Sequence, residues 1–365
     1  MINKVILTHF KKLDWILITT VFLLVGIGFL SIYSSSLLKG NFLNFKKQII
    51  FFVFSIFLMI LLSFFDWRAF QENPYLILVL YFLCLFLLIG LFFFAPEIRG
   101  TRRWYKLGPI SIDPIEFVKI ILIILLAKYF SMRHVEMYRI SHILISGLYF
   151  LIPAIFVFFQ PDLGSVFILA ILWIGISIVS GIKIRHFLVL CFISFLILIL
   201  TWSFFLKDYQ RQRIISFFQP MIEPLGIGWS RIQAKIAIGA GGIFGQGIGK
   251  GSQTQYGFLP EPQTDFIFSA IAEEMGLIGI FVLLFLFSIL IWRIIKIALS
   301  AKSNFPRLFA SGFAILLVSQ IFIHIGMNLG LLPIIGIPLP FVSYGGSNLI
   351  FSFVCLGILE SFRVY

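Results

Sequence analysis

The chain has 365 residues, of which 60% are hydrophobic and 12% are charged, and its formal net charge is +13. A soluble domain of this size covers its apolar residues with a polar surface, and this composition supplies too few polar residues for that. The composition therefore excludes one soluble core and predicts a protein that crosses a membrane several times.

Long uncharged stretches indicate how the chain crosses. Residues 76–95 and 187–206 are each long enough to span the hydrocarbon core, because a helix of about 20 residues crosses roughly 30 Å. Both lack the period-two alternation of a barrel strand, and hydrocarbon offers no water to unpaired backbone groups, so both are expected to be helices.

The N-terminal stretch KKLDWILITTVFLLVGIGFL has the basic start of a signal peptide, but no A-x-A-like cleavage site follows it and many apolar segments do. We interpret it as a first span. The sequence predicts an all-α integral membrane protein, a single polytopic membrane domain over residues 1–365 with about ten transmembrane helices. The expected spans lie near 13–34, 47–65, 75–95, 114–131, 141–159, 163–182, 186–206, 264–295, 308–332 and 341–360.

One long loop, about 207–263, separates the predicted spans 7 and 8. In a ten-span chain the loops after spans 3, 5, 7 and 9 face the same side. These loops contain RGTRRWYKLGP, QPDLGS, the long loop itself and LLPIIGIPLP. The unusual chemistry of the chain is therefore expected on one face of the membrane.

The charge of the loops indicates which face this is. In the predicted topology the 28 Lys and Arg residues divide evenly between the two sides, so their number does not show which side is cytoplasmic. However, the loops RIIKIALSAKSNFPR and SGIKIRH are short, basic and free of acidic residues, which marks the cytoplasmic side. We predict that both termini are cytoplasmic and that the motif loops lie outside.

The first motif is a basic cluster of Arg99, Arg102, Arg103 and Lys106, interrupted by Trp104. Guanidinium groups bind phosphate oxygens in a bidentate way, and an indole suits the level of the lipid headgroups. The cluster could bind a phosphorylated substrate, with Arg102 and Arg103 as candidates. It could equally be an interfacial loop that is attracted to any anionic lipid.

Three further charged residues lie at or near the ends of apolar segments. Glu116 and Lys119 are three residues apart, so they lie on one helix face and could form a structural ion pair or contact a polar substrate. Asp162 follows a proline and precedes an apolar run, where an aspartate commonly caps a helix. By its position in the topology, Asp162 could also face the same outer cavity.

Asp265 lies in LPEPQTDFIF, where the chain enters an apolar run. Pro262 favours a helix start, so we expect Asp265 in the first turn of span 8, where the helix dipole stabilises a carboxylate. An ionised group at the membrane edge is costly unless it is compensated, which makes Asp265 a candidate functional residue. Its alternative role is that of a helix-terminal carboxylate without chemistry.

The remaining polar, glycine-rich and cysteine residues are expected to have structural roles. The run GAGGIFGQGIGKG allows close backbone approach but does not fit the P-loop pattern, which disfavours a nucleotide enzyme. Glu273 and Glu274 point about 100° apart on a helix, so at least one is expected to make an internal polar contact. His324 is expected to be a satisfied bundle residue, and the three cysteines give no evident disulfide or metal framework.

The motifs together resemble one family, the SEDS glycosyltransferases of bacterial cell-wall synthesis, and within it the rod-shape (RodA) type. The resemblance covers nearly the whole chain. It rests on RRWYKLG with PIEFVK, QPDLGS, WSRIQAKIAIGAGGIFGQGIGKGSQTQYGFLPEPQTDFIF with EEMGLIG, and IGIPLPFVSYGGS. Ile115, Gln246 and Asn348 depart from the usual family pattern, but the carboxylates are retained.

The resemblance implies a peptidoglycan polymerase that joins lipid II units, with an undecaprenyl diphosphate-linked donor and inversion, on the outer face of the bacterial cytoplasmic membrane during cell elongation. Asp265 matches the family's proposed general base, and Glu116, Lys119 and Asp162 match polar positions of its central cavity. A flippase that moves the lipid-linked precursor is the alternative, because it would need similar spans and charges.

The resemblance also implies partners. A divalent cation, Mg²⁺ or Mn²⁺, is expected near the diphosphate, although no ligand spacing identifies its site and the metal ligands remain unknown. A class B penicillin-binding transpeptidase is the expected protein partner, with its single helix against spans 8 and 9. Membrane lipid surrounds the chain, and no nucleic acid is expected to bind.

Overall fold

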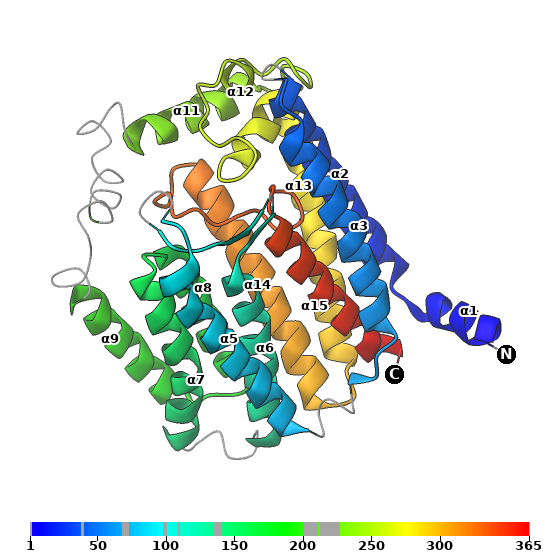
Figure 1. The fold of residues 1–365 in the computed structure, drawn as a ribbon, viewed down its shortest axis with the longest axis vertical. Coiled ribbons are helices and arrows are strands. Elements are labelled where there is room, and N and C mark those ends of the chain that lie inside the picture. Colours follow the sequence, from blue (N-terminus) through cyan, green and yellow to red (C-terminus); the bar gives the residue numbers. More distant parts are fainter. Residues whose placement is uncertain are drawn as a thin grey trace.

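The structure is a computed structural model. It describes residues 2–37, 40–67, 73–97, 101–108, 110–133, 140–200, 211 and 227–364. Figure 1 shows a bundle of roughly aligned helices, with a short helix at the N-terminus that projects from the bundle and two further short helices at its upper end.

The described helices and strands follow one another along the chain in this order. The helices are α1 (Ile2–Lys12), α2 (Trp15–Leu37), α3 (Leu43–Ser63), α5 (Pro74–Phe94), α6 (Pro114–Arg133), α7 (Ile140–Phe159), α8 (Leu163–Val179), α9 (Ile184–Leu200), α11 (Ile227–Ala240), α12 (Ser252–Gln255), α13 (Ile267–Ser300), α14 (Asn304–Asn328) and α15 (Gly346–Val364). The strands β1 (Tyr105–Leu107) and β2 (Ile110–Ile112) form an antiparallel hairpin between α5 and α6.

The helices confirm a multi-pass membrane protein. Among the described residues, seven helices are long and apolar enough to cross a membrane: α2, α3, α5, α7, α13, α14 and α15. Helices α6, α8 and α9 coincide with the other three predicted spans, but α8 and α9 have only 17 residues each and α6 carries several charges. The count of ten spans therefore stays a prediction.

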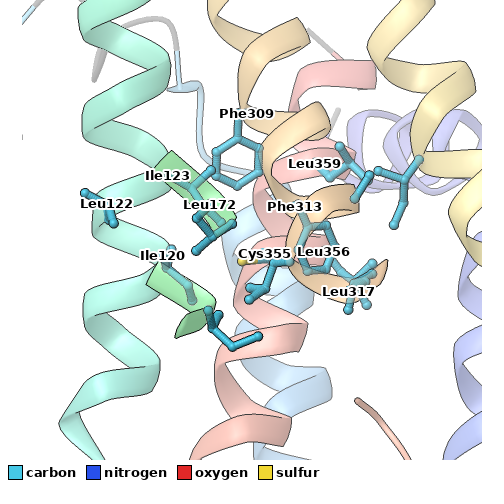
Figure 2. Close-up of a cluster of buried hydrophobic side chains, with 14 of the residues drawn as sticks. Ile120, Leu122, Ile123, Leu172, Phe309, Phe313, Leu317, Cys355, Leu356 and Leu359 are labelled. Atoms are coloured by element: carbon cyan, nitrogen blue, oxygen red, sulfur yellow. The ribbon is translucent and has the colours of Figure 1, made fainter. Parts of the chain in front are cut away.

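Helices α6, α8, α14 and α15 meet in one part of the hydrophobic core of the bundle. Figure 2 shows Ile123 of α6, Leu172 of α8, Phe313 of α14 and Leu356 of α15 in one cluster, and all four side chains are fully buried. Many outward-facing leucines and phenylalanines of the other helices are exposed instead, as expected of side chains that face lipid. The core therefore fixes the four helices whose upper ends surround the polar residues.

Some predicted boundaries were wrong. The predicted spans 264–295 and 341–360 begin too early, because α13 starts at Ile267 and α15 at Gly346. The segment 207–263 is not simply a loop, since it contains α11 and α12, although residues 207–210 and 212–226 lie outside the described residues. Sequence analysis also missed α1 and the β1–β2 hairpin.

Helix α13 is interrupted at Gly276, whose φ of 68° and ψ of −164° are not helical. The glycine-rich loop repairs the break with hydrogen bonds of 2.9 to 3.2 Å. The amides of 246–247 donate to the carbonyls of 273–274, and the amides of 277–278 donate to the carbonyls of 242–243. The first part of α13 is thereby clamped to the loop, which explains why the run is so rich in glycine.

Candidate active site

Arg103 lies at the centre of the polar residues at the upper end of the bundle. Its Nε is 3.0 Å from Oδ2 of Asp162, and its Nη2 is 3.4 Å from Oδ2 of Asp113. Its guanidinium also lies over the ring of Trp104, 5.3 Å from the ring centroid. The loop after α5 is thereby joined to the starts of α6 and α8.

The surrounding carboxylates compensate the burial of this cation. Burial alone would lower the pKa of Arg103, but the charges of Asp162, Asp113, Glu116 and Asp265 together raise it above its ordinary value. The side chain therefore stays charged. Asp265 belongs to this group, so the electrostatic field of Arg103 reaches the predicted catalytic residue.

Asp113 completes the start of α6. Its Oδ1 accepts a hydrogen bond of 3.2 Å from the amide of Ile115, and its own amide donates to Oγ of Ser347 over 2.9 Å. Burial raises the pKa of Asp113 to about 6, against the opposing attraction of Arg103. Sequence analysis missed this residue, although an aspartate directly before Pro114 is a recognisable helix-start signal.

Asp162 caps α8, as the sequence predicted, and also forms an ion pair that was not predicted, while its expected place in an outer cavity stays a prediction. Its Oδ1 caps α8 by accepting a hydrogen bond of 3.2 Å from the amide of Ser165, while its Oδ2 pairs with Arg103. The carboxylate is 5% exposed, so neither oxygen is a free surface group. The two roles are compatible because each uses a different oxygen.

Glu116 and Lys119 form the expected pair on one face of α6. Nζ of Lys119 donates to Oε1 of Glu116 over 2.7 Å, and Nδ2 of Asn348 donates to Oε2 of the same carboxylate over 3.2 Å. All three side chains are buried. Asn348 thus ties the start of α15 to this pair, at a position where the family pattern usually has serine.

The basic cluster predicted from the sequence is split by the structure. Arg102 is half-exposed, donates to the carbonyl of Phe92 and pairs with Glu97 over 3.4 Å, whereas Arg103 points into the carboxylate cluster. The two guanidinium groups therefore have different partners, and the substrate-binding role expected of Arg102 and Arg103 stays a prediction. Arg99 lies outside the described residues.

Asp265 lies in the turn that precedes α13. The expected position in the first helical turn is wrong, because the helix begins at Ile267 and its N-cap is Phe266. The residue is partly exposed. A methyl group added to Gly336 would lie 3.7 Å from Oδ2 of Asp265, so the carboxylate faces the backbone of the loop between α14 and α15.

Glu273 and Glu274 have separate internal roles. Glu273 accepts hydrogen bonds from the amides of Gln253 and Thr254, at 2.6 and 3.0 Å, and so caps α12. Glu274 accepts hydrogen bonds from Ser34 of α2 and from Gln255. The expectation of internal contacts at this pair is confirmed, and it accounts for both carboxylates.

The expectation of a satisfied His324 holds for one ring nitrogen only, because Nε2 is buried without a hydrogen-bond partner among the described residues. Nδ1 of His324 lies 2.8 Å from the carbonyl of Ile337, inside the bundle. Cys84 and Cys355 are free and buried, and the side chain of Cys191 lies outside the described residues. None of these side chains forms a described contact with Arg103.

The described residues do not form a metal cage by themselves. Within the described ranges, no group of three or more His, Cys, Asp or Glu side chains is arranged to hold a metal ion. Asp113 and Asp162 are instead bound to Arg103, and Glu116 to Lys119.

The comparisons with known proteins agree with this architecture. The family model described as "Cell cycle protein" (FtsW, RodA and SpoVE) matches residues 14–365. The chain is 38% identical over 286 residues to the peptidoglycan glycosyltransferase MrdB of Escherichia coli (strain K12), covering 78% of this chain and 77% of that protein.

Two solved structures are similar over most of the chain. One is described as "Structural coordination of polymerization and crosslinking by a peptidoglycan synthase complex"; its TM-score is 0.82 at 31% identity, covering 96% of this chain and 97% of that one. The other is the rod shape determining protein RodA of Thermus thermophilus, with a TM-score of 0.72 at 29% identity and 96% coverage of both chains.

The extent of the family match, from residue 14 to residue 365, includes each element that carries a charged residue of the site. The chain belongs to the FtsW/RodA/SpoVE family of cell cycle proteins.

Proposed function

We infer that this protein is a peptidoglycan glycosyltransferase of the rod-shape type, with its chemistry at the upper end of the bundle. The observation that carries this inference is the placement of Asp265. A carboxylate from the turn before α13 lies within the field of Arg103, which also binds Asp162 and Asp113. In this proposal the site combines a base, Asp265, with a partly buried cation.

The reaction is one displacement at a sugar carbon. The 4-hydroxyl of the acceptor sugar attacks C1 of the donor sugar, and Asp265 takes the hydroxyl proton as the new C–O bond forms. The bond between C1 and the diphosphate oxygen breaks, and the undecaprenyl diphosphate leaves with the electron pair. Attack opposite the leaving group inverts the anomeric centre. Lipid II supplies the donor.

The charge of the site bears on the leaving group. In the contacts described for this site, the carboxylates Asp113, Asp162, Glu116 and Asp265 lie near the cations Arg103 and Lys119. A diphosphate would therefore benefit from an additional positive charge. Mg²⁺ or Mn²⁺ held mainly by phosphate oxygens is our proposal, since Mg²⁺ is commonly bound by one or two carboxylates together with substrate phosphates.

Glu116 and Lys119 lie on the same side of the bundle as Arg103, and we propose that this buried pair contacts the substrate. We place this side outside the cytoplasmic membrane and both termini in the cytoplasm, because the acid-free basic loops lie at the opposite ends of the helices. The segment 1–365 is proposed to act as one membrane domain.

A transpeptidase of the class B penicillin-binding type is the proposed partner. Helix α13 exposes the large apolar side chains of Phe281, Phe285 and Trp292, and we propose that this flank receives the partner's single transmembrane helix. If contact activates the enzyme, the purified chain alone should polymerise slowly and the added partner should raise its rate. Full activity without the partner would contradict this part of the proposal.

The central test is Asp265→Asn, assayed with purified protein and lipid II. The asparagine is nearly isosteric, so the variant should insert and remain monodisperse while glycan synthesis falls by about 10² to 10⁴. Glu97→Gln, the same chemical change at an exposed carboxylate of the same end, is the matched control and should keep its activity. Wild-type polymerisation by Asp265→Asn would refute the assignment. Movement of precursor across vesicles without polymer would favour a flippase.

A further inference from the structure

The turn that carries Asp265 is held by its own backbone carbonyls. The carbonyl of Gln263 accepts a hydrogen bond of 2.8 Å from the amide of Tyr344, and that of Thr264 accepts one of 3.0 Å from Oγ of Ser343. The carbonyl of Asp265 accepts one of 2.9 Å from Nδ2 of Asn328. Three consecutive carbonyls are thus bound to groups far away in sequence.

Asn328 is the last residue of α14, and all of its hydrogen-bonding capacity is used. Nδ2 donates to the carbonyls of Asp265 and His324, at 2.9 and 2.8 Å, and Oδ1 accepts from the amide and the hydroxyl of Ser269, at 3.2 and 2.7 Å. The side chain is completely buried. Two carbonyls on one side and two donors on the other fix which end of the amide carries the nitrogen.

Ser343, in the loop between α14 and α15, makes the second side-chain contact to the turn that carries Asp265. Its Oγ donates to Thr264 and accepts a hydrogen bond of 2.9 Å from the amide of Leu339, which orients the hydroxyl. Phe341, two residues earlier, has a φ of 63°, in the left-handed region that favours glycine. This loop therefore keeps a costly backbone conformation while Ser343 reaches the turn.

We propose that Asn328 and Ser343 are positioning residues for Asp265: they fix the backbone of its turn through the carbonyls of residues 264 and 265, so that the carboxylate meets the acceptor hydroxyl in reactive geometry. Neither side chain touches the carboxylate in its described contacts. The inference rests on the proposed function of Asp265 and names two residues that the sequence motifs alone leave without a role.

Loss of these contacts should change the reaction rate more than the affinity for the substrate. A general base must lie within hydrogen-bond reach of the proton that it removes. A displacement of about 1 Å can cost about 10²-fold in rate, while contacts to the remote parts of a large lipid-linked substrate are unaffected. Loss of either side chain should therefore lower kcat and leave KM nearly unchanged.

The experiment measures kcat and KM for lipid II with the purified full chain and its partner transpeptidase. Asn328→Ala should lower kcat by about 10- to 100-fold, and Ser343→Ala by about 3- to 10-fold, with KM within about threefold of wild type. Rates are divided by the amount of monodisperse protein, and unfolding temperatures are recorded for each variant.

Three variants separate positioning from general stability. Asn328→Asp keeps the acceptor toward Ser269 but loses both donors, so its kcat should fall as far as that of Asn328→Ala. Ser269→Ala removes only a bond on the acceptor side and should stay near wild type. Ser361→Ala, which deletes a comparable buried hydrogen bond of 2.7 Å to the carbonyl of Phe65 at the opposite end, should lower stability without lowering kcat.

Wild-type kcat in folded Asn328→Ala and Ser343→Ala would overturn the proposal. So would losses no larger than that of Ser361→Ala, or losses confined to KM. If Asp265→Asn is inactive and these variants are fully active, only the positioning roles fail. If Asp265→Asn is itself fully active, the proposed function of that residue fails instead.

Discussion

Nε of Arg103 lies 3.0 Å from Oδ2 of Asp162, although the two residues belong to different loops separated by α6 and α7. The same aspartate caps α8, so the cation is bound to a group that the helix already holds in place. The contact converts a local helix cap into a link between two loops. The neighbouring Arg102 instead pairs with the exposed Glu97 and donates to the carbonyl of Phe92.

Arg103 and Arg102 should therefore differ sharply on substitution. Arg103→Ala leaves Asp162 and Asp113 buried without their cation, which typically costs about 3–5 kcal/mol, and it also removes positive charge from the site. We expect a lower unfolding temperature and at least about tenfold less polymerisation. Arg102→Ala should change both quantities little, because its ion pair is exposed. Equal effects of the two substitutions would contradict the arrangement.

The pair of Glu116 and Lys119 can be assigned by a double substitution. Lys119→Met leaves Glu116 buried with only Asn348 as its described partner, so stability should fall by about 3–5 kcal/mol. Glu116→Gln combined with Lys119→Met removes both charges and should recover most of the unfolding temperature. Polymerisation should remain low in the double variant if the pair contacts substrate. Recovery of activity together with stability would show that the pair is structural.

Asp113 should give the protein a specific dependence on pH. Its pKa is raised from 3.8 to about 6, so between about pH 4 and pH 6 the folded protein holds a proton that the unfolded chain has released. Stability from this residue therefore falls as the pH rises through that window, by about 3 kcal/mol. Asp113→Asn should lose this part of the decline. Unfolding temperatures at pH 4.5 and pH 7 test it, and equal pH responses of variant and wild type would refute it.

The clamp between the glycine-rich loop and α13 predicts a contrast between two glycines. Gly245 has a φ of +80°, and an added methyl group would lie 2.1 Å from the carbonyl oxygen of Glu274. Gly245→Ala should therefore disrupt the bend of α13 and abolish both stable folding and polymerisation. Gly257 has a similar φ of +77° but open space around it, so Gly257→Ala should cost only backbone strain, about 1–2 kcal/mol. Comparable effects at both positions would exclude close packing as the cause.

The membrane character, the helical class and most span positions could be predicted from the sequence, because hydrocarbon forces the backbone into helices of a fixed minimum length. The pairing of Glu116 with Lys119 was predictable for the same kind of reason, since both residues lie on one helix at a spacing of three. The family motifs likewise predicted Asp265 as the catalytic residue.

Only the tertiary structure decided how residues from different helices combine. The separation of Arg102 from Arg103, the second role of Asp162, and the contacts from Asn328 and Ser343 to the turn of Asp265 all join segments that are far apart in the chain. No local periodicity encodes such contacts, because they depend on how the helices pack and how the loops between them cross. The sequence determined which charged and polar residues are present at the membrane edge, and helix packing determined which of them meet, since a buried charge is stable only where the fold brings its partner.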